Sequence, residues 1–263
     1  MQEPFTLTSA LTLAPEGWEH SPLTVRQLDV ERAGMRLCER VSADLHSGTI
    51  WQVTGPNGTG KTSLLMRLAG LIPTDRECAE WHGAGCTHWP KRYLGHHAGL
   101  NARLTVDENL NFLARIPQWG RATRAECRDA LHQVGLAGYE DEAASRLSSG
   151  QKRRVLLALL WLPVQPPLWL LDEPFTALDV TMVALLEDRL REYAATGGRV
   201  VLTSHQPLSV VTHELNLQRY QVQADWLDDQ NEGRERDGTN GSEPAHQAVK
   251  PRAASVASSG NPL

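Results

Sequence analysis

Gly55-Pro56-Asn57-Gly58-Thr59-Gly60-Lys61-Thr62, which continues into Ser63, is the stretch that decides the fold. The apolar run at residues 48–54 reads as a buried strand before it, and residues 61–70 read as the helix after it. In this order of strand, loop and helix, glycines let the backbone curl so that its N–H groups face phosphate oxygens. Lys61 is expected to contact the β- and γ-phosphates, and Thr62 to contact a Mg²⁺ ion. The stretch therefore predicts a site for a nucleoside triphosphate.

Two carboxylates follow a second apolar run, at residues 168–171. Asp172 is placed at the end of this predicted strand, where it is expected to hold Mg²⁺ and its waters. Glu173 comes next and is expected to polarise the attacking water as a general base. A simple turn before Pro174 would explain two adjacent acidic residues, but it would not explain their combination with the glycine-rich loop. Catalysis is therefore the preferred interpretation.

His205 closes a third apolar run, at residues 200–203. An imidazole at the carboxyl end of a strand is expected to reach the γ-phosphate. The carboxyl ends of parallel strands meet at one edge of a sheet, so Lys61, Glu173 and His205 are expected to share one catalytic site.

The stretch Leu147-Ser148-Ser149-Gly150-Gln151 predicts a second place where an anion could bind. Gly150 begins a predicted helix, so the hydroxyl of Ser149 and the nearby N–H groups would face a phosphate. Ser148 could instead be only the N-cap of that helix. Two phosphate-binding helix starts in separate parts of one chain suggest an ATP shared between two copies, and so a homodimer.

Composition indicates a globular protein without an electrostatic site for nucleic acid. The chain has 263 residues, 41% of them hydrophobic, and a formal net charge of -5, so DNA and RNA are not expected partners. The longest apolar run, residues 155–164, is ten residues long, well short of the roughly 18–20 that cross a bilayer. Residues 1–15 contain no lysine or arginine, which argues against a secretory signal and favours a cytoplasmic location.

The pattern along the chain predicts one folded domain between two extensions. Residues 1–22 are expected to be partly ordered at best, and residues 223–263, rich in Gly, Ser, Pro, Asn and charge, are expected to be disordered. The domain between them, residues 23–222, is predicted to be an α/β core interrupted by a helical insert at about 98–163. Thr105-Val106-Asp107-Glu108 has the spacing of a capping box at the start of one of its helices.

Cysteine and histidine leave one different class of function open. The cysteines show no pairing pattern, which is typical of a reducing compartment: Cys38, Cys78, Cys86 and Cys127. Cys78, His82, Cys86 and His88 could nevertheless form a haem- or metal-binding regulatory module. Because no CxxC or CxxCH is present, ordinary strand and loop residues are the preferred interpretation.

Together these motifs resemble the ABC transporter ATPase family. The resemblance covers about residues 23–222, and it includes the order of five motifs: GPNGTGKT as Walker A, LSSGQ as the signature, LLDEP as Walker B, TALD ending at Asp179 as the D-loop, and His205 as the switch histidine. It implies an α/β P-loop NTPase core with a helical subdomain and an antiparallel β part. It also implies ATP and Mg²⁺ as ligands, with Asp179 and the signature serving the nucleotide site.

A narrower resemblance is to the cytochrome c biogenesis branch of that family. It rests on LCER at residues 37–40, YLGHHAG at 93–99, SSGQKRRVLLALLWL at 148–162 and SHQPL at 204–208. It implies a homodimer beneath membrane subunits of the CcmB and CcmC kind, peripheral at the cytoplasmic face of a bacterial inner membrane. ATP hydrolysis would serve haem export or release of a haem-loaded periplasmic chaperone. The alternatives are a different ABC transporter and a soluble ABC ATPase acting on nucleic acid or ribosomes; the single cassette disfavours the latter.

Two positions depart from the family pattern. His97 stands where the family has a glutamine that helps to hold Mg²⁺, and an imidazole nitrogen is a poorer ligand for that hard ion. We expect activity to survive this change. The aromatic residue that often stacks on adenine is not evident either, and Arg36 is the candidate to pack there.

Overall fold

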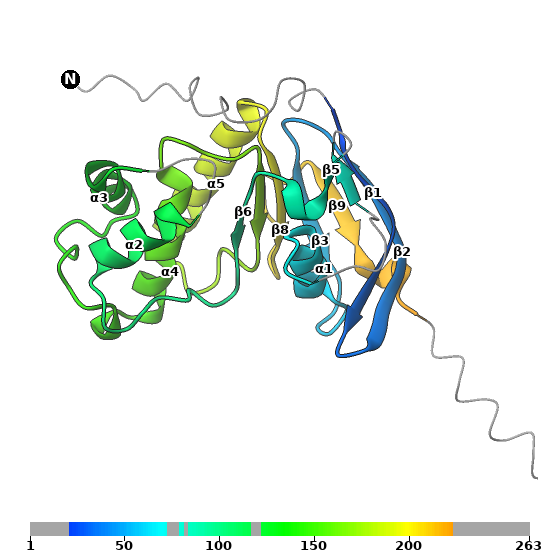
Figure 1. Ribbon diagram of the computed structural model, residues 1–263, viewed down its shortest axis with the longest axis horizontal. Helices are drawn as coiled ribbons and strands as arrows, with labels where there is room; N and C mark the ends of the chain where they lie inside the picture. Colours follow the sequence, from blue (N-terminus) through cyan, green and yellow to red (C-terminus); the bar gives the residue numbers. More distant parts are fainter. Residues whose placement is uncertain (1–20, 73–78, 82–83, 117–121, 223–263) are drawn as a thin grey trace, which may run out of the picture. The chain divides into compact units, whose positions relative to one another are not determined.

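The computed structural model describes residues 21–72, 79–81, 84–116 and 122–222 (Figure 1). The predicted N-terminal extension, residues 1–22, lies outside the described residues except for its last two. The predicted disordered tail, residues 223–263, lies wholly outside them. None of the helices in the described part has the length and apolar character needed to cross a membrane.

A five-stranded parallel sheet forms the centre of the fold. Its strand order is β6-β7-β8-β3-β9. Its strands are β3 (Ile50–Thr54), β6 (Lys91–Leu94), β7 (Leu168–Leu171), β8 (Arg199–Thr203) and β9 (His213–Asn216). All neighbouring pairs run parallel, which directs the loops after β3, β7 and β8 to one edge.

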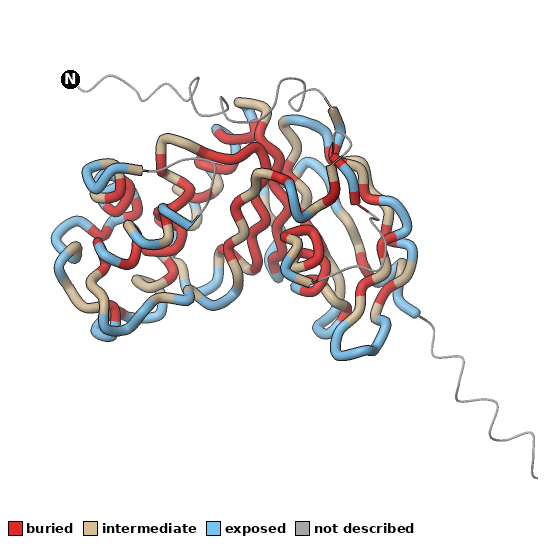
Figure 2. The backbone as a smooth tube through the Cα atoms, in the orientation of Figure 1, coloured by how far each residue is buried: buried red, intermediate tan, exposed pale blue. Residues whose placement is uncertain are grey.

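The edge strand β9 has no buried residue, but both faces of the sheet are buried along β7 and β8, as continuous apolar runs in parallel strands require. Figure 2 shows the burial concentrated along these strands. On β7, Leu168 and Leu170 join one hydrophobic core, while Trp169 and Leu171 join the other. The alternation follows from the two-residue period of a strand. Helices on the two sides therefore rest on a common sheet whose loops converge at one edge.

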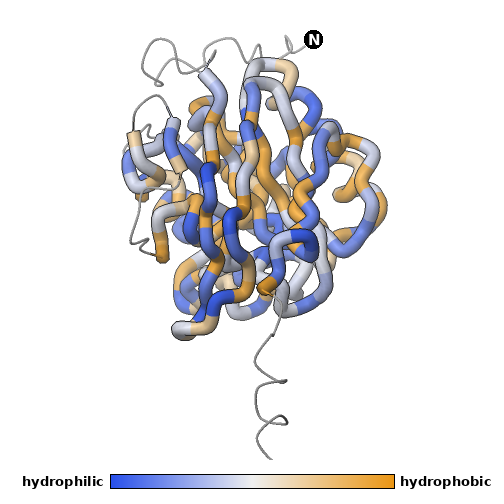
Figure 3. The backbone as a smooth tube through the Cα atoms, turned by 90° about the vertical axis from the view of Figure 1, so that its right-hand side faces the viewer, coloured by the Kyte–Doolittle hydropathy of each residue, from blue (hydrophilic) through white to orange (hydrophobic). Residues whose placement is uncertain are grey.

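A second, antiparallel sheet covers one side of the centre. It has the order β2-β1-β4-β5, with β1 (Leu23–Arg32), β2 (Met35–Leu45), β4 (Ala79–Trp81) and β5 (Ala84–Gly85). Buried and exposed residues mix along β1 and β2, and Figure 3 shows the corresponding changes between hydrophobic and hydrophilic residues. Helix α1 (Lys61–Leu68) contributes Leu64, Leu65 and Leu68 to the core shared by the two sheets.

Helices gather on the other side (Figure 1). They are α2 (Val106–Arg115), α3 (Arg124–Gln133), α4 (Ser149–Leu157) and α5 (Val180–Ala195), with 3-10 turns at η3 (Ala144–Arg146) and η4 (Ala158–Trp161). Two further 3-10 turns in the described residues are η2 (Cys86–His88) and η5 (Leu217–Tyr220). Thr105 forms the predicted capping box with Glu108 at the start of α2. This arrangement of helices with parallel and antiparallel sheets confirms the predicted fold class.

Candidate active site

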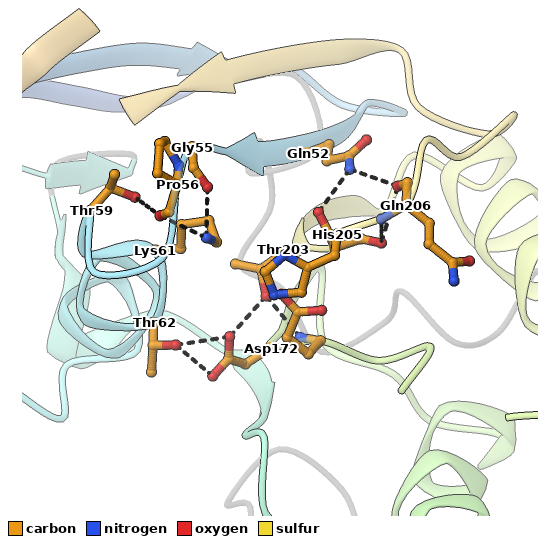
Figure 4. Close-up of polar contacts among 12 residues, drawn as sticks. Gln52, Gly55, Pro56, Thr59, Lys61, Thr62, Asp172, Thr203, His205 and Gln206 are labelled. Carbon is orange, nitrogen blue, oxygen red and sulfur yellow. Dashed lines mark hydrogen bonds and ion pairs between the residues drawn. The ribbon is translucent and has the colours of Figure 1, made fainter. Parts of the chain in front are cut away.

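A pocket of about 230 Å³ opens where the loop after β3 enters α1. Its lining includes Asn57, Gly58, Gly60, Lys61, Thr62, Ser63, Glu173 and His205, all of which were predicted site residues. They come from the segments that follow three strands: the loop and first turn of α1 after β3, and the loops after β7 and β8. The edge of the parallel sheet thus gathers the predicted catalytic residues in one place, as Figure 4 shows for Lys61 and His205.

The loop before α1 has a shape that requires glycine. Gly60 is the N-cap residue at φ 98°, in the left-handed region, and no side chain caps the helix. A Cβ at Gly60 would lie 2.9 Å from Val30 Cγ1, so any other residue would be both strained and crowded. The Lys61 ammonium donates to the carbonyl oxygens of Gly55 at 2.8 Å and Pro56 at 3.1 Å. Its charge therefore lies within the curled loop.

Hydrogen bonds join the start of α1 to the end of β7 (Figure 4). The hydroxyl of Thr62 donates to the Asp172 carboxylate, at 3.2 Å from Oδ1 and 3.0 Å from Oδ2. The hydroxyl of Thr203, at the end of β8, donates to Asp172 Oδ1 at 2.8 Å. Asp172 is only 1% exposed. Two hydroxyls thus fix a buried carboxylate at the edge of the pocket.

Glu173 has an unusual backbone conformation. Its φ is 50°, and left-handed backbone costs a residue other than glycine about 1–2 kcal/mol. Its N–H donates to Thr203 Oγ1 at 2.8 Å, which helps to hold that conformation. Its carboxylate lies 3.3 Å from His205 Nε2, and the His205 side chain is 61% exposed. The acid and the histidine therefore face each other across the mouth of the pocket.

The predicted signature residues lie elsewhere, at the start of α4. Ser148 is the N-cap: its Oγ accepts from the N–H of Gln151, and Gln151 Oε1 accepts from the N–H of Ser148. Ser149 is exposed. A Cβ at Gly150 would lie 2.7 Å from the carbonyl oxygen of Ala177, so a larger residue would displace either the start of α4 or the loop at Ala177. Asp179 caps α5 and pairs with Arg154 of α4. Among the described residues, the pocket lining includes none of these.

Comparison with known proteins agrees with this geometry. Residues 38–176 match the family described as ABC transporter. The chain belongs to the ABC transporter family. It is an ATP-binding and ATP-hydrolysing subunit of that family.

Curated relatives place this ABC ATPase near one group. The "Cytochrome c biogenesis ATP-binding export protein CcmA" of Escherichia coli O157:H7 is 43% identical over 199 residues, which cover 73% of this chain and 93% of the relative. The proteins of the same name from Shigella dysenteriae serotype 1 and Escherichia coli K12 are 43% and 42% identical, with the same coverage.

Solved structures have the same fold. A Pyrococcus furiosus protein described as the ATP-binding protein of an ABC transporter has a TM-score of 0.67 and 25% identity. The match covers 77% of this chain and 100% of that protein. An ATP-binding cassette in its ADP conformation has a TM-score of 0.59 at 19% identity, covering 74% and 86% of the two chains, and shows the fold alone.

Sequence reasoning missed Gln52 in this ABC ATPase. Gln52 lies within β3 and is 8% exposed, and its Nε2 donates to the carbonyl oxygens of Ser204 at 3.2 Å and Gln206 at 3.0 Å. The side chain thereby holds the backbone on both sides of His205 (Figure 4). A polar residue in an otherwise apolar strand was the available signal, since a buried amide needs partners.

Two predicted positions differ from their neighbours that line the pocket. His96 lines the pocket, whereas the predicted His97 does not; both are exposed and their rings make an edge contact. Arg32 and Leu37 line the pocket, whereas Arg36 pairs with Glu39 at 2.9 Å. In both cases neighbouring side chains of a strand or loop point in different directions. The sequence therefore predicted which segment borders the pocket, but not which of its residues line it.

The residues around Asp172 suit Mg²⁺. Carboxylate and hydroxyl oxygens are the hard ligands that this ion prefers, and Asp172 and Thr62 already lie within 3.2 Å of each other. Histidine and cysteine offer no comparable site: within the described residues there is no group of three or more His, Cys, Asp or Glu that could hold a metal. Cys78 and His82, half of the alternative module, lie outside the described residues.

Proposed function

We propose that the chain is the ATPase subunit of an exporter for cytochrome c biogenesis, and that it works as a homodimer. Each nucleotide would lie between Lys61 of one copy and Ser149 and Gly150 of the other. The dimer would bind at the cytoplasmic face of the inner membrane, beneath membrane subunits of the CcmB and CcmC kind. Its hydrolysis of ATP would power haem export or release of the haem-loaded chaperone.

One observation supports the homodimer: the start of α4, the second helix start expected to bind phosphate, does not line the first pocket. Ser149 is exposed at the start of α4, whereas the residues that line the pocket come from the glycine-rich loop and α1, from β1 and β2, and from the segments after β6, β7 and β8. A helix N-terminus favours anions through its N–H groups and dipole. An exposed one in the same chain is well suited to complete the pocket of another copy.

The proposed roles follow from the contacts. Lys61 would exchange its loop carbonyls for phosphate oxygens, and the glycine-rich loop would supply backbone N–H groups. Glu173 would accept a proton from the attacking water, with His205 orienting its carboxylate from 3.3 Å. Thr62 and Asp172 would hold Mg²⁺, which neutralises phosphate charge when bound. His97, Asp179, Ser148 and Gln151 would support the nucleotide from the surrounding loops.

The assignment to cytochrome c biogenesis rests on the relatives. Their shared printed name is a cytochrome c biogenesis ATP-binding export protein, and the match spans 93% of their length. An ATPase of a different ABC transporter would share the fold and the pocket but not this level of identity to one group. The two assignments are distinguished by a haem stain for c-type cytochromes in cells that depend on this chain.

The first experiment tests the dimer through Glu173→Gln. Removing the general base should lower kcat by about 100-fold or more, because the water loses its proton acceptor. ATP would then remain bound, and size-exclusion chromatography with ATP and Mg²⁺ should show a dimer. A protein that stays monomeric at saturating ATP would refute the shared site.

The control for that experiment is Glu173→Gln combined with Ser149→Arg. Ser149 is exposed, so the fold should tolerate the change, while the bulky side chain should block the partner's nucleotide. This double variant should bind ATP as a monomer.

The second experiment is rescue of c-type cytochromes in a bacterium lacking its own CcmA, where the wild-type chain should succeed and Glu173→Gln should fail. Failure of the wild type would favour a different transporter.

A further inference from the structure

Arg153 is a buried cation that no part of the proposed mechanism uses. It lies on α4, four residues after Ser149, and is 5% exposed. All three nitrogens of the Arg153 guanidinium donate hydrogen bonds. Nη1 donates to the carbonyl oxygens of Gly95 at 2.7 Å and His96 at 3.3 Å. The segment after β6 is therefore tied to the signature helix.

The other two nitrogens reach the end of β7. Nη2 donates to the carbonyl oxygens of Asp172 and Glu173, both at 2.8 Å, and Nε donates to that of Pro174 at 3.4 Å. A planar guanidinium presents five N–H donors in a fixed fork, which lysine cannot reproduce. One side chain thus binds five backbone carbonyls in two loops that border the nucleotide pocket.

Burial of this charge is costly, which argues that its geometry matters. Burial lowers the pKa of the Arg153 guanidinium, while the charges of Asp172 and Glu173 act in the opposite direction. Its five hydrogen-bond acceptors are all main-chain oxygens, which offset the loss of water only in part. An apolar residue could fill the same space but would remove the Arg153 N–H donors from these carbonyls, and the Glu173 carbonyl would keep the N–H of Thr176 at 3.2 Å.

Glu173 is the point where this contact acts. Its left-handed backbone, at φ 50°, is held on one side by Thr203 Oγ1, which accepts its N–H at 2.8 Å. Arg153 holds the other side through the Glu173 carbonyl. Backbone strain of this kind persists only where the surroundings fix it from several directions. The direction of the Glu173 carboxylate therefore depends on both contacts.

We infer that Arg153 is a positioning residue for ATP hydrolysis, which fixes Glu173 and joins it to the helix that begins with the signature. The inference rests on the role proposed for Glu173. Ser149 and Arg153 belong to the same rigid helix, one turn apart. A displacement of Ser149 by a partner's nucleotide therefore reaches the chain's own Glu173 and the segment at His96 through a single side chain.

The test compares Arg153→Met and Arg153→Lys with the wild-type dimer. A misplaced catalytic group costs on the order of 100-fold in rate, so Arg153→Met should lower kcat by about that factor. The Kd for ATP should change less than about threefold, since the phosphate loop is intact. Arg153→Lys keeps the charge but not the planar fork of donors, so its kcat should lie between those of the wild type and Arg153→Met. A fall in ATP affinity with kcat unchanged would overturn the inference.

The matched control is Arg189→Met. Arg189 is 7% exposed on α5 and donates to the carbonyl oxygen of Leu160 at 2.9 Å, away from the pocket. It should lower the melting temperature about as much as Arg153→Met but leave kcat within about twofold. Equal kcat values for the two variants would show that Arg153 is merely structural. Should Arg153→Met not fold, Arg153→Lys against Arg189→Lys gives the same comparison.

A double variant separates this inference from the proposed function. In the Glu173→Gln background, Arg153→Met should lower the residual rate no further, because the group it positions is already gone. If Arg153→Met lowered the residual rate by the same factor as it lowers kcat in the wild type, the positioning role would be overturned. A wild-type rate of hydrolysis in Glu173→Gln would refute the role proposed for Glu173, and the inference with it. An inactive Glu173→Gln beside a fully active Arg153→Met would refute only the inference.

Discussion

The starts of α1 and α4 are both candidates for binding phosphate, yet they are built in opposite ways. At α1 the N-cap is Gly60, no side chain caps the helix, and Lys61 and Ser63 are buried. At α4 the N-cap is Ser148, which forms a capping box with Gln151, and Ser149 is exposed. The first start leaves its N–H groups for a ligand inside its own pocket. The second is stable on its own and faces outward.

The starts of α1 and α4 are held in place by different contacts. The α1 start is fixed by hydrogen bonds from Thr62 to Asp172 and from Thr203 to the same carboxylate. The α4 start has its own capping box, and Gly150 lies close to the carbonyl oxygen of Ala177. Changes at α1 should therefore affect nucleotide binding by a single chain. Changes at α4 should affect only the steps that need two chains.

The largest expected effect is at α1. Lys61→Ala removes the cation of the phosphate loop, and the loss of charge-assisted hydrogen bonds should raise the Kd for ATP by about 100-fold. Isothermal titration calorimetry of the monomer measures this directly. Ser149→Ala is the control, with an unchanged Kd. Equal losses in the two variants would break the contrast between the helix starts.

An intermediate effect is expected at α4. In Gly150→Ala the new Cβ would lie 2.7 Å from the carbonyl oxygen of Ala177, so the signature loop must shift. We expect kcat to fall about 30-fold, since small misplacements have large effects on rate. ATP binding by the monomer should stay unchanged. A rise in the monomer's Kd would show that the signature serves its own chain, contrary to the comparison.

The smallest effect concerns the loop after β6. His97 is exposed and does not line the pocket, whereas His96 does. His97→Gln should therefore change steady-state ATPase rates less than about threefold, within the range of exposed substitutions. His96→Ala, measured beside it, should give the larger decrease. A rise of orders of magnitude in His97→Gln would show that the native histidine impairs the enzyme.

Much of this fold could be predicted because its signals are local. The apolar runs matched β7 residue for residue and β8 to within one residue, and the spacing of Thr105 and Glu108 marked the start of α2. The pocket followed from polar residues at strand ends, since parallel strands bring those ends together. Features that depend on residues close together in the sequence could therefore be predicted.

The supporting side chains could not be predicted because their partners are main-chain oxygens distant in sequence. Gln52 bonds to carbonyls more than 150 residues away, and Arg153 bonds to loops 19 to 58 residues away. Any residue has a carbonyl, so no pattern of residue types reveals the acceptor. His96 and His97 show a related point: the path of a loop decides which of two adjacent rings lines the pocket, and the role expected of His97 stays a prediction.

The Cys38 thiol, which is fully buried, donates to the carbonyl oxygen of Thr59 at 3.1 Å and contacts that of Leu217 at 3.6 Å. The neighbouring Leu37 carbonyl accepts from the N–H of Val222. Thr59 in the glycine-rich loop is therefore linked through Cys38 and Leu37 to the segment at residues 217–222. A truncation before Leu217 would remove the contact of its carbonyl with Cys38 and the hydrogen bond from Val222 to Leu37, and so would reach the residue that bonds to Thr59 in the glycine-rich loop.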